Sequence, residues 1–287
     1  MSALQLAPHR SSRRFRFGRA VSLAVAACSL SLPVGLSGAG AEGLPFFVDT
    51  NPGVQPGGPL QSKGGFCTMN FLFKGSDGHR YIGTAGHCIL GGGVSLPGGD
   101  DDAKEEDTST GPSEFERIWA PGQGPEVSGR DDTRVGEFAY AVLTDPKDFA
   151  LVRLDPDVEA SPAVAHFGGP TGLNEDLTDD PVVLEFYGQS PGVGTLLPAR
   201  TMVALNMPNP DRVFATGPGA PGDSGSGVIS ADGRAVGVLV TGGLHTGGQA
   251  DGPPEFGIIG ISRIGPQMRR AAEVLGITLE LVTVNAS

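Results

Sequence analysis

Short apolar runs rich in β-branched residues recur through most of the chain, and turn-forming pairs such as Asp232-Gly233 separate several of them. Runs of this kind between turn signals predict β-strands, here over residues 66–73, 80–84, 138–143, 149–154, 182–187, 200–204, 226–229, 235–241 and 257–261. One helix is predicted late in the chain, where Pro266 suits a first turn and Gly276 suits a stop. Many short strands with one helix predict an all-β sandwich or barrel.

Glycine and proline are abundant, with 46 Gly and 24 Pro among 287 residues, close to a quarter of the chain. This composition argues against a helical bundle or coiled coil. The polar, glycine-rich stretch 91–134 is predicted to be a long surface loop. Its acidic run at 100–107 has a calcium loop as the alternative interpretation, although it lacks the alternating oxygen ligands and placed glycine of an EF-hand.

Residues 1–41 have the features of an export signal: a basic start, an apolar stretch from Ala20 to Leu36 and a small-x-small site ending at Ala41. We expect cleavage before Glu42 and a secreted protein. Two finer interpretations stay open: the pair at 13–14 resembles a twin-arginine signal, and residues 25–28 resemble a lipoprotein box that would place a lipid on Cys28. Residues 42–64 are Pro- and Gly-rich and are predicted to be an extended lead-in.

The net charge of the chain bears on which partners it can bind. The signal removes five of the 20 basic residues and none of the 32 acidic ones, which leaves a net charge of about −17. Nucleic-acid binding needs a basic surface, so no nucleic-acid partner is expected. Beyond the N-terminus no apolar run approaches the roughly 20 residues needed to span a bilayer, so no membrane span is expected.

Two cysteines remain after the signal, Cys67 and Cys88. An even pair in an exported chain predicts a disulfide. A metal site is the alternative, but it needs more soft ligands at close spacing, and His87 alone lies near. We therefore expect a disulfide and neither a metal nor a cofactor.

Three short motifs carry the chemistry. The first is TAGHC at 84–88, directly after a predicted strand; the second is DFALVRL at 148–154; the third is PGDSGSG at 221–227. Their candidate catalytic residues are His87, Asp148, which opens the second motif, and Ser224. A serine hydroxyl becomes a nucleophile when an imidazole takes its proton, and a carboxylate holds that imidazole in the correct tautomer. Glycines beside the serine allow backbone N–H groups to face a developing oxyanion.

In this order, with gaps of 61 and 76 residues, the motifs resemble those of the chymotrypsin/trypsin-type serine peptidases, most closely the bacterial streptogrisin-like branch. The resemblance covers roughly residues 65–275 and is specific at the three motifs. It implies two packed six-stranded antiparallel Greek-key β-barrels with a short C-terminal helix, in a peptidase domain over 65–287. The barrels would span roughly 65–170 and 171–265, with the site between them. The same resemblance pairs Cys67 with Cys88 beside the catalytic histidine.

The resemblance also implies the role of each residue. His87 is the general base and then the general acid, Asp148 orients it, and Ser224 is the nucleophile of an acyl-enzyme mechanism. The N–H groups of Gly222 and Ser224 form the oxyanion hole. Asp145 is the competing acid, but Asp148 is preferred because an apolar strand follows it directly.

The implied substrate is a polypeptide, cleaved by a monomeric endopeptidase. Pro218 stands where trypsin-like members carry an acid, which disfavours cleavage after Arg or Lys. Thr241, Gly242 and Gly243 resemble the strand that lines the substrate pocket, and His245 is a weaker candidate for contact with an acidic side chain.

The sequence departs from the family in several places. Ser226 stands where the family usually has Gly, a change not expected to touch the mechanism, and the family's second disulfide and its Ile-Val-Gly-Gly-like start are missing. Two other classes remain as alternatives: a catalytically weak or inactive binding protein of the same fold, and a lipase or esterase. The latter is disfavoured because the third motif lacks the last glycine of G-x-S-x-G.

Overall fold

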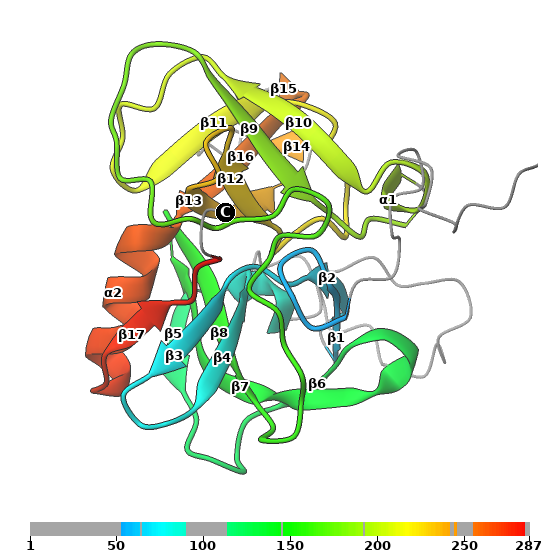
Figure 1. Ribbon diagram of the computed structural model, residues 1–287, viewed down its shortest axis with the longest axis vertical. Helices are drawn as coiled ribbons and strands as arrows, with labels where there is room; N and C mark the ends of the chain where they lie inside the picture. Colours follow the sequence, from blue (N-terminus) through cyan, green and yellow to red (C-terminus); the bar gives the residue numbers. More distant parts are fainter. Residues whose placement is uncertain are drawn as a thin grey trace, which may run out of the picture. The chain divides into compact units, whose positions relative to one another are not determined.

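A computed structural model of the chain describes residues 53–63, 65–89, 114–144, 146–191, 193–241, 244–245 and 255–284. All of them belong to one compact unit, Pro45–Ser287. Two large antiparallel β-sheets and one two-stranded sheet make up this unit (Figure 1). No helix among the described residues combines the length and the apolar character that crossing a membrane requires.

The first sheet has nine strands, in the order β17-β3-β4-β8-β7-β6-β1-β2 with β5 also paired to β7. Its strands are β1 (Pro59–Ser62), β2 (Gly65–Thr68), β3 (Leu72–Gly75), β4 (Arg80–Thr84), β5 (Phe115–Ile118), β6 (Glu126–Ser128), β7 (Arg134–Thr144), β8 (Lys147–Leu154) and β17 (Leu279–Leu281). The segment between β2 and β3 forms hydrogen bonds with two other parts of the sheet. Met69 N–H donates to Gly58 O, just before β1, at 2.8 Å, and Asn70 N–H donates to Gly83 O in β4 at 2.7 Å. These bonds curl the sheet back on itself.

The second sheet is a closed six-stranded barrel, in the order β10-β11-β16-β13-β12-β9. Its strands are β9 (Val182–Tyr187), β10 (Ala199–Ala204), β11 (Arg212–Thr216), β12 (Gly227–Ser230), β13 (Ala235–Thr241) and β16 (Ile258–Arg263). The remaining elements are α1 (Val193–Leu196), the hairpin β14 (Leu244–His245) and β15 (Glu255–Phe256), the 3-10 turns η1 (Gly86–Ile89) and η2 (Arg130–Asp132), and α2 (Ile264–Leu275).

One continuous core joins the two sheets. Buried apolar residues of the first sheet, such as Phe149, pack in the same cluster as Val238 of the closed barrel and Ile264 of α2. A second cluster fills the closed barrel, with Phe186 and Ile261 among its members. Figure 1 shows α2 lying alongside the first sheet, next to β17.

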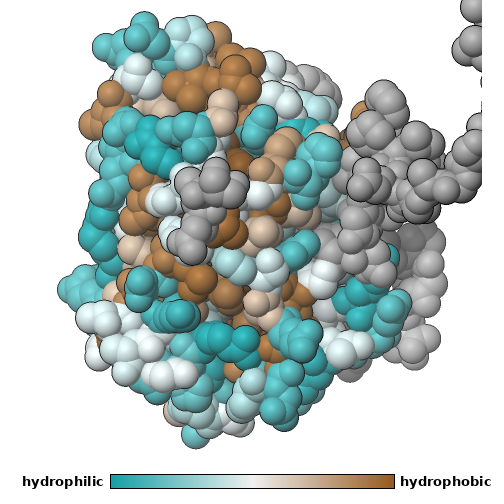
Figure 2. Space-filling model, viewed as in Figure 1, coloured by the Kyte–Doolittle hydropathy of each residue, from teal (hydrophilic) through white to brown (hydrophobic). Residues whose placement is uncertain are grey.

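The outer face of the closed barrel carries some apolar side chains. Val183 of β9 and Val203 of β10 are direct cross-strand partners, and both are exposed. Leu205, which follows β10, and Phe214, in the middle of β11, are also exposed. Figure 2 shows apolar residues among polar ones where β9 and β10 cross this face.

The predicted fold class is confirmed: two packed antiparallel sheets, the second a six-stranded barrel, followed by a C-terminal helix. The first sheet differs from the expectation, because it has nine strands and not six. The surface-loop prediction for 91–134 is wrong in its second half, which forms β5, β6 and η2. The acidic run at 100–107 lies outside the described residues. The helix stop is confirmed, since Gly276 caps α2 at φ 68°.

Candidate active site

His87 sits on η1, the 3-10 turn that follows β4. β4 is buried in the first sheet, so the turn begins from a fixed position. Gly86 makes close packing possible, because a Cβ at this position would overlap the backbone carbonyl of Val142 in β7. The turn thereby presents the His87 side chain with 21% of its surface exposed.

Asp148 holds His87 at two points. Its Oδ2 lies 2.7 Å from His87 Nδ1, and its Oδ1 accepts the His87 backbone N–H at 2.9 Å. Asp148 is the second residue of β8, which pairs with β4 and β7, so the carboxylate is as firmly placed as the imidazole. The expected preference for this acid fits the geometry; Asp145 lies outside the described residues.

The carboxylate also changes the acidity of the ring. Burial alone lowers the pKa of His87, but the charge of Asp148 and its hydrogen bond outweigh burial and raise that pKa above its usual value of 6.5. A neutral His87 that donates from Nδ1 to Asp148 has its Nε2 lone pair available to accept a proton.

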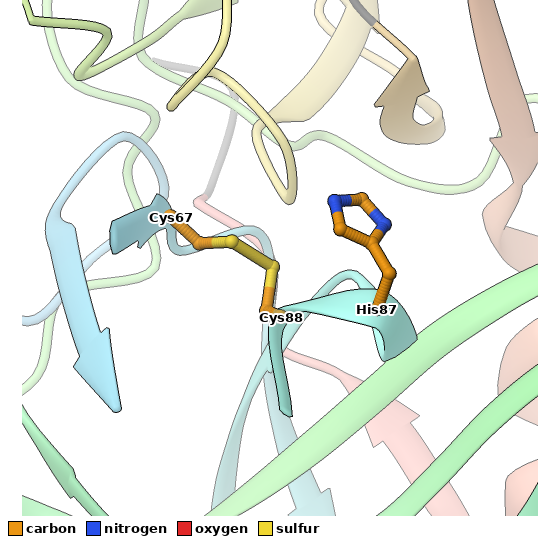
Figure 3. A group of neighbouring side chains, drawn as sticks. All are labelled: Cys67, His87 and Cys88. Atoms are coloured by element: carbon orange, nitrogen blue, oxygen red, sulfur yellow. A yellow bond between two sulfur atoms is a disulfide. The ribbon is translucent and has the colours of Figure 1, made fainter. Parts of the chain in front are cut away.

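The predicted disulfide is confirmed. Cys67 of β2 and Cys88 of η1 are bonded, with their Cα atoms 6.2 Å apart. Figure 3 shows the bridge tying β2 to the turn from which the His87 ring projects. The ligand atoms of Cys67, His87 and Cys88 lie within 4.8 Å of one another, but the bond between the sulfurs removes both thiolates that a metal would need.

Ser224 lies in a tight turn that enters β12, named here the Ser224 turn (residues 222–226). Gly222 and Gly225 have φ values of 98° and 93°, which side chains other than glycine rarely adopt. The Gly225 Cα packs so closely that an added Cβ would overlap the Thr68 carbonyl oxygen, and Ala85 N would lie 3.1 Å from it. The turn therefore lies against the segment that leads into His87.

The Ser224 turn is bonded across to the first sheet. The Thr68 backbone N–H donates to Ser224 O, and the Thr68 hydroxyl donates to Gly222 O, both at 2.8 Å. Ser224 itself is half-buried. Within the described part of the chain, no hydrogen bond joins Ser224 Oγ to the His87 ring, a contact that often tightens only once substrate is bound.

Arg200 supports the Ser224 turn, and sequence reasoning missed it. Its guanidinium holds the Asp223 carboxylate through two nitrogens, each 2.5 Å from one carboxylate oxygen. Its Nη1 also donates to the backbone oxygen of Pro218 at 2.9 Å. Strand alternation carried the signal, because Arg200 shares the inward face of β10 with Met202 and Ala204. A cation on an apolar inward face requires a buried acid.

The predicted substrate-pocket residues are only partly placed. Pro218 is exposed in the segment between β11 and the Ser224 turn. Thr241 ends β13, opposite Gly260. Gly242, Gly243 and the side chains of Thr241 and His245 lie outside the described residues.

The chain matches no protein-family model and no curated protein. Among solved structures it is similar to Thermobifida fusca Protease A, at 17% identity over 80% of this chain and 99% of that one, with a TM-score of 0.46. It is similar to Nocardiopsis protease, at 17% identity over 79% and 98%, with a TM-score of 0.47. It is also similar to Cellulomonas bogoriensis chymotrypsin, at 16% identity over 80% and 99%, with a TM-score of 0.46.

Proposed function

We propose that the protein is a serine endopeptidase in which His87, Asp148 and Ser224 hydrolyse peptide bonds. The observation that carries the proposal is the pair of hydrogen bonds between Asp148 and His87. His87 lies on a turn that packs against the Ser224 turn. A carboxylate, an imidazole and a glycine-flanked serine are the groups that acyl transfer requires.

The steps follow from these groups. Ser224 Oγ attacks the substrate carbonyl carbon while its proton passes to His87 Nε2, and Asp148 stabilises the imidazolium that forms. The carbonyl electrons move onto oxygen, where the N–H groups of Gly222 and Ser224 stabilise the negative charge. The C–N bond then breaks as His87 donates the proton to the leaving amine. Water attacks the acyl-enzyme by the same route and regenerates Ser224.

The finer features remain part of the proposal. The substrate is a polypeptide, and cleavage after Arg or Lys is disfavoured because Pro218 offers no acid. The enzyme acts as an exported monomer after removal of residues 1–41, with lipid attachment through Cys28 as the alternative. It uses no cofactor, and its peptidase domain covers 65–287.

Substitution of Ser224 with Ala tests the proposal. The variant should remain folded and lose hydrolysis by a factor of about 10⁴ to 10⁶. Peptide-library cleavage and labelling by a fluorophosphonate probe give the readout. Ser230→Ala is the control, because it removes a buried serine hydroxyl at the other end of β12.

The outcome separates the candidate functions. Labelling and peptide cleavage by the native protein that are both lost only in Ser224→Ala support a serine peptidase, whereas labelling without peptide cleavage supports the lipase or esterase. A folded native protein that neither labels nor cleaves any library member supports the non-catalytic binding protein instead.

A further inference from the structure

Three consecutive carbonyl oxygens of the Ser224 turn are each held by a specific donor. Gly222 O accepts the Thr68 hydroxyl, and Ser224 O accepts the Thr68 backbone N–H, both at 2.8 Å. Asp223 O accepts two bonds from Ser226: the hydroxyl at 2.7 Å and the backbone N–H at 3.0 Å. Thr68 and Ser226 are both fully buried, so water does not compete for these carbonyls.

The bonds on the carbonyls decide where the N–H groups point. In a planar trans peptide the N–H lies opposite the C=O. The peptide between Asp223 and Ser224 has its oxygen fixed by Ser226, so the Ser224 N–H must point the other way. No hydrogen bond to an acceptor in the described residues uses this N–H or that of Gly222.

Thr68 acts on the second donor from the other barrel. Its hydroxyl holds the peptide that follows Gly222 and also accepts the Gln189 backbone N–H at 3.1 Å. Since Gly222 has a φ of 98°, it could rotate more freely than other residues if this bond were lost. The Gly222 N–H belongs to the preceding peptide, between Pro221 and Gly222, so the hydroxyl acts on this N–H indirectly, by fixing one of the two peptide planes that meet at Gly222.

We propose that the hydroxyls of Thr68 and Ser226 are positioning groups, which hold the Gly222 and Ser224 N–H donors aimed at the developing oxyanion. This inference rests on the proposed peptidase function. It differs from the expectation that Ser226, in place of the usual Gly, leaves the mechanism untouched. A glycine at this position keeps the backbone bond to Asp223 O and loses the hydroxyl bond.

The size of the effect follows from what each change removes. Loss of an oxyanion-hole donor itself costs about 10²–10³ in kcat. Ser226→Ala leaves both donors and one bond to Asp223 O in place, so we expect kcat to fall by about tenfold, in line with one net hydrogen bond. KM should change little, because the hydroxyl binds the turn and not the substrate.

The experiment compares Ser226→Ala, Thr68→Val and Thr68→Ser with the native enzyme. The readouts are kcat and KM on one cleaved peptide, and the acylation burst with 4-nitrophenyl acetate, which needs no side-chain recognition. Thr68→Ser keeps the hydroxyl and should restore most of the activity that Thr68→Val loses. Ser230→Ala is the matched control: it removes a buried serine hydroxyl and should leave kcat native-like.

Two further measurements separate positioning from stability. All rates are taken where urea titration shows each variant fully folded, and the pH midpoint of activity should stay native, since His87 and Asp148 are unchanged. Native kcat in both folded Ser226→Ala and Thr68→Val would overturn the inference and leave the proposed function standing. Absence of acylation in the native protein would overturn the proposed function itself.

Discussion

The Arg200 guanidinium and the Asp223 carboxylate form a two-point ion pair that is almost closed to solvent, with side-chain exposures of 2% and 0%. The Asp223 carboxylate also accepts the backbone N–H groups of Ser190 and Ala220 at 3.0 and 2.8 Å. Because Asp223 directly precedes Ser224, these bonds fix the backbone next to Ser224. Arg200 thus supplies from within the chain the cation that this buried acid needs.

Replacing Arg200 with Met should therefore destabilise the fold strongly. The change leaves Asp223 buried without a counter-charge, and losing one partner of a buried pair costs about 3–5 kcal/mol. Urea unfolding measures the loss. The double variant Arg200→Met with Asp223→Asn should be less destabilised than Arg200→Met, since no charge remains buried. Arg269→Met breaks an exposed pair with Glu175 and should leave the midpoint near native. An undisturbed midpoint in Arg200→Met would contradict the assigned role.

Peptidase activity should fall as the pH drops. His87 must be neutral to accept a proton, and its pKa is raised above 6.5, so activity is present above the raised pKa and is lost below it. The acidic midpoint of kcat/KM should therefore lie above 6.5. Asp148→Asn removes the charge that raises this pKa, so the midpoint should move down and kcat should fall by about 10⁴. Asp155→Asn, at an exposed carboxylate, is the control. A kcat/KM that stays constant down to pH 4 would show that His87 is not the general base.

Loss of the disulfide should lower both stability and activity. Cys67 and Cys88 are 21 residues apart, and closing a loop of this size contributes about 3 kcal/mol in the chain-entropy account. The double variant Cys67→Ala with Cys88→Ala should melt at a lower temperature. Activity should fall as well, because η1 carries His87 next to Cys88. Intact-mass analysis checks the native bond, and two alkylatable thiols in the unreduced, denatured protein would refute it.

Gly225→Ala should be far more damaging than Gly78→Ala. Both glycines have positive φ, 93° and 83°, so both changes incur the same backbone cost of about 1–2 kcal/mol. A Cβ at Gly78 meets nothing within 4 Å, whereas one at Gly225 overlaps Thr68 O and Thr84 Oγ1. The difference between the two unfolding free energies isolates the clash between the Ser224 turn and the first sheet. Equal losses would mean that the turn has room to move.

Much of the fold could be predicted because its strands are buried on alternating or on both faces. β4, β9 and β13 have the predicted bounds, and each is an apolar run between turn signals. β5 was missed because it has almost no buried face, and β6 because it has three residues within a polar, glycine-rich stretch. Local pattern cannot reveal a strand that is defined by its pairing with β7.

The residues of the candidate site likewise fall into those that a local sequence pattern reveals and those that it does not. His87, Asp148 and Ser224 could be predicted because each lies in a distinctive motif. Strand alternation marks Arg200 as an inward-facing cation but does not identify its partner Asp223, 23 positions away, and nothing in the sequence marks Thr68, whose partner Gly222 is 154 positions away. The Thr68 contact forms only once the two sheets have packed together, and the Arg200 contact only once the closed barrel has brought β10 to the Ser224 turn.

The strand β17, at the C-terminal end of the described chain, completes a sheet built from the first half of the chain. It covers the outer edge of β3, and Thr278 N–H bonds Ser76 Oγ from 202 positions away in sequence. A fragment that holds only the first half of the chain would leave this edge unpaired, and open strand edges invite aggregation. The two halves are therefore poor candidates for separate expression. Pairings over such separations also slow folding, because the loop they close must be ordered first.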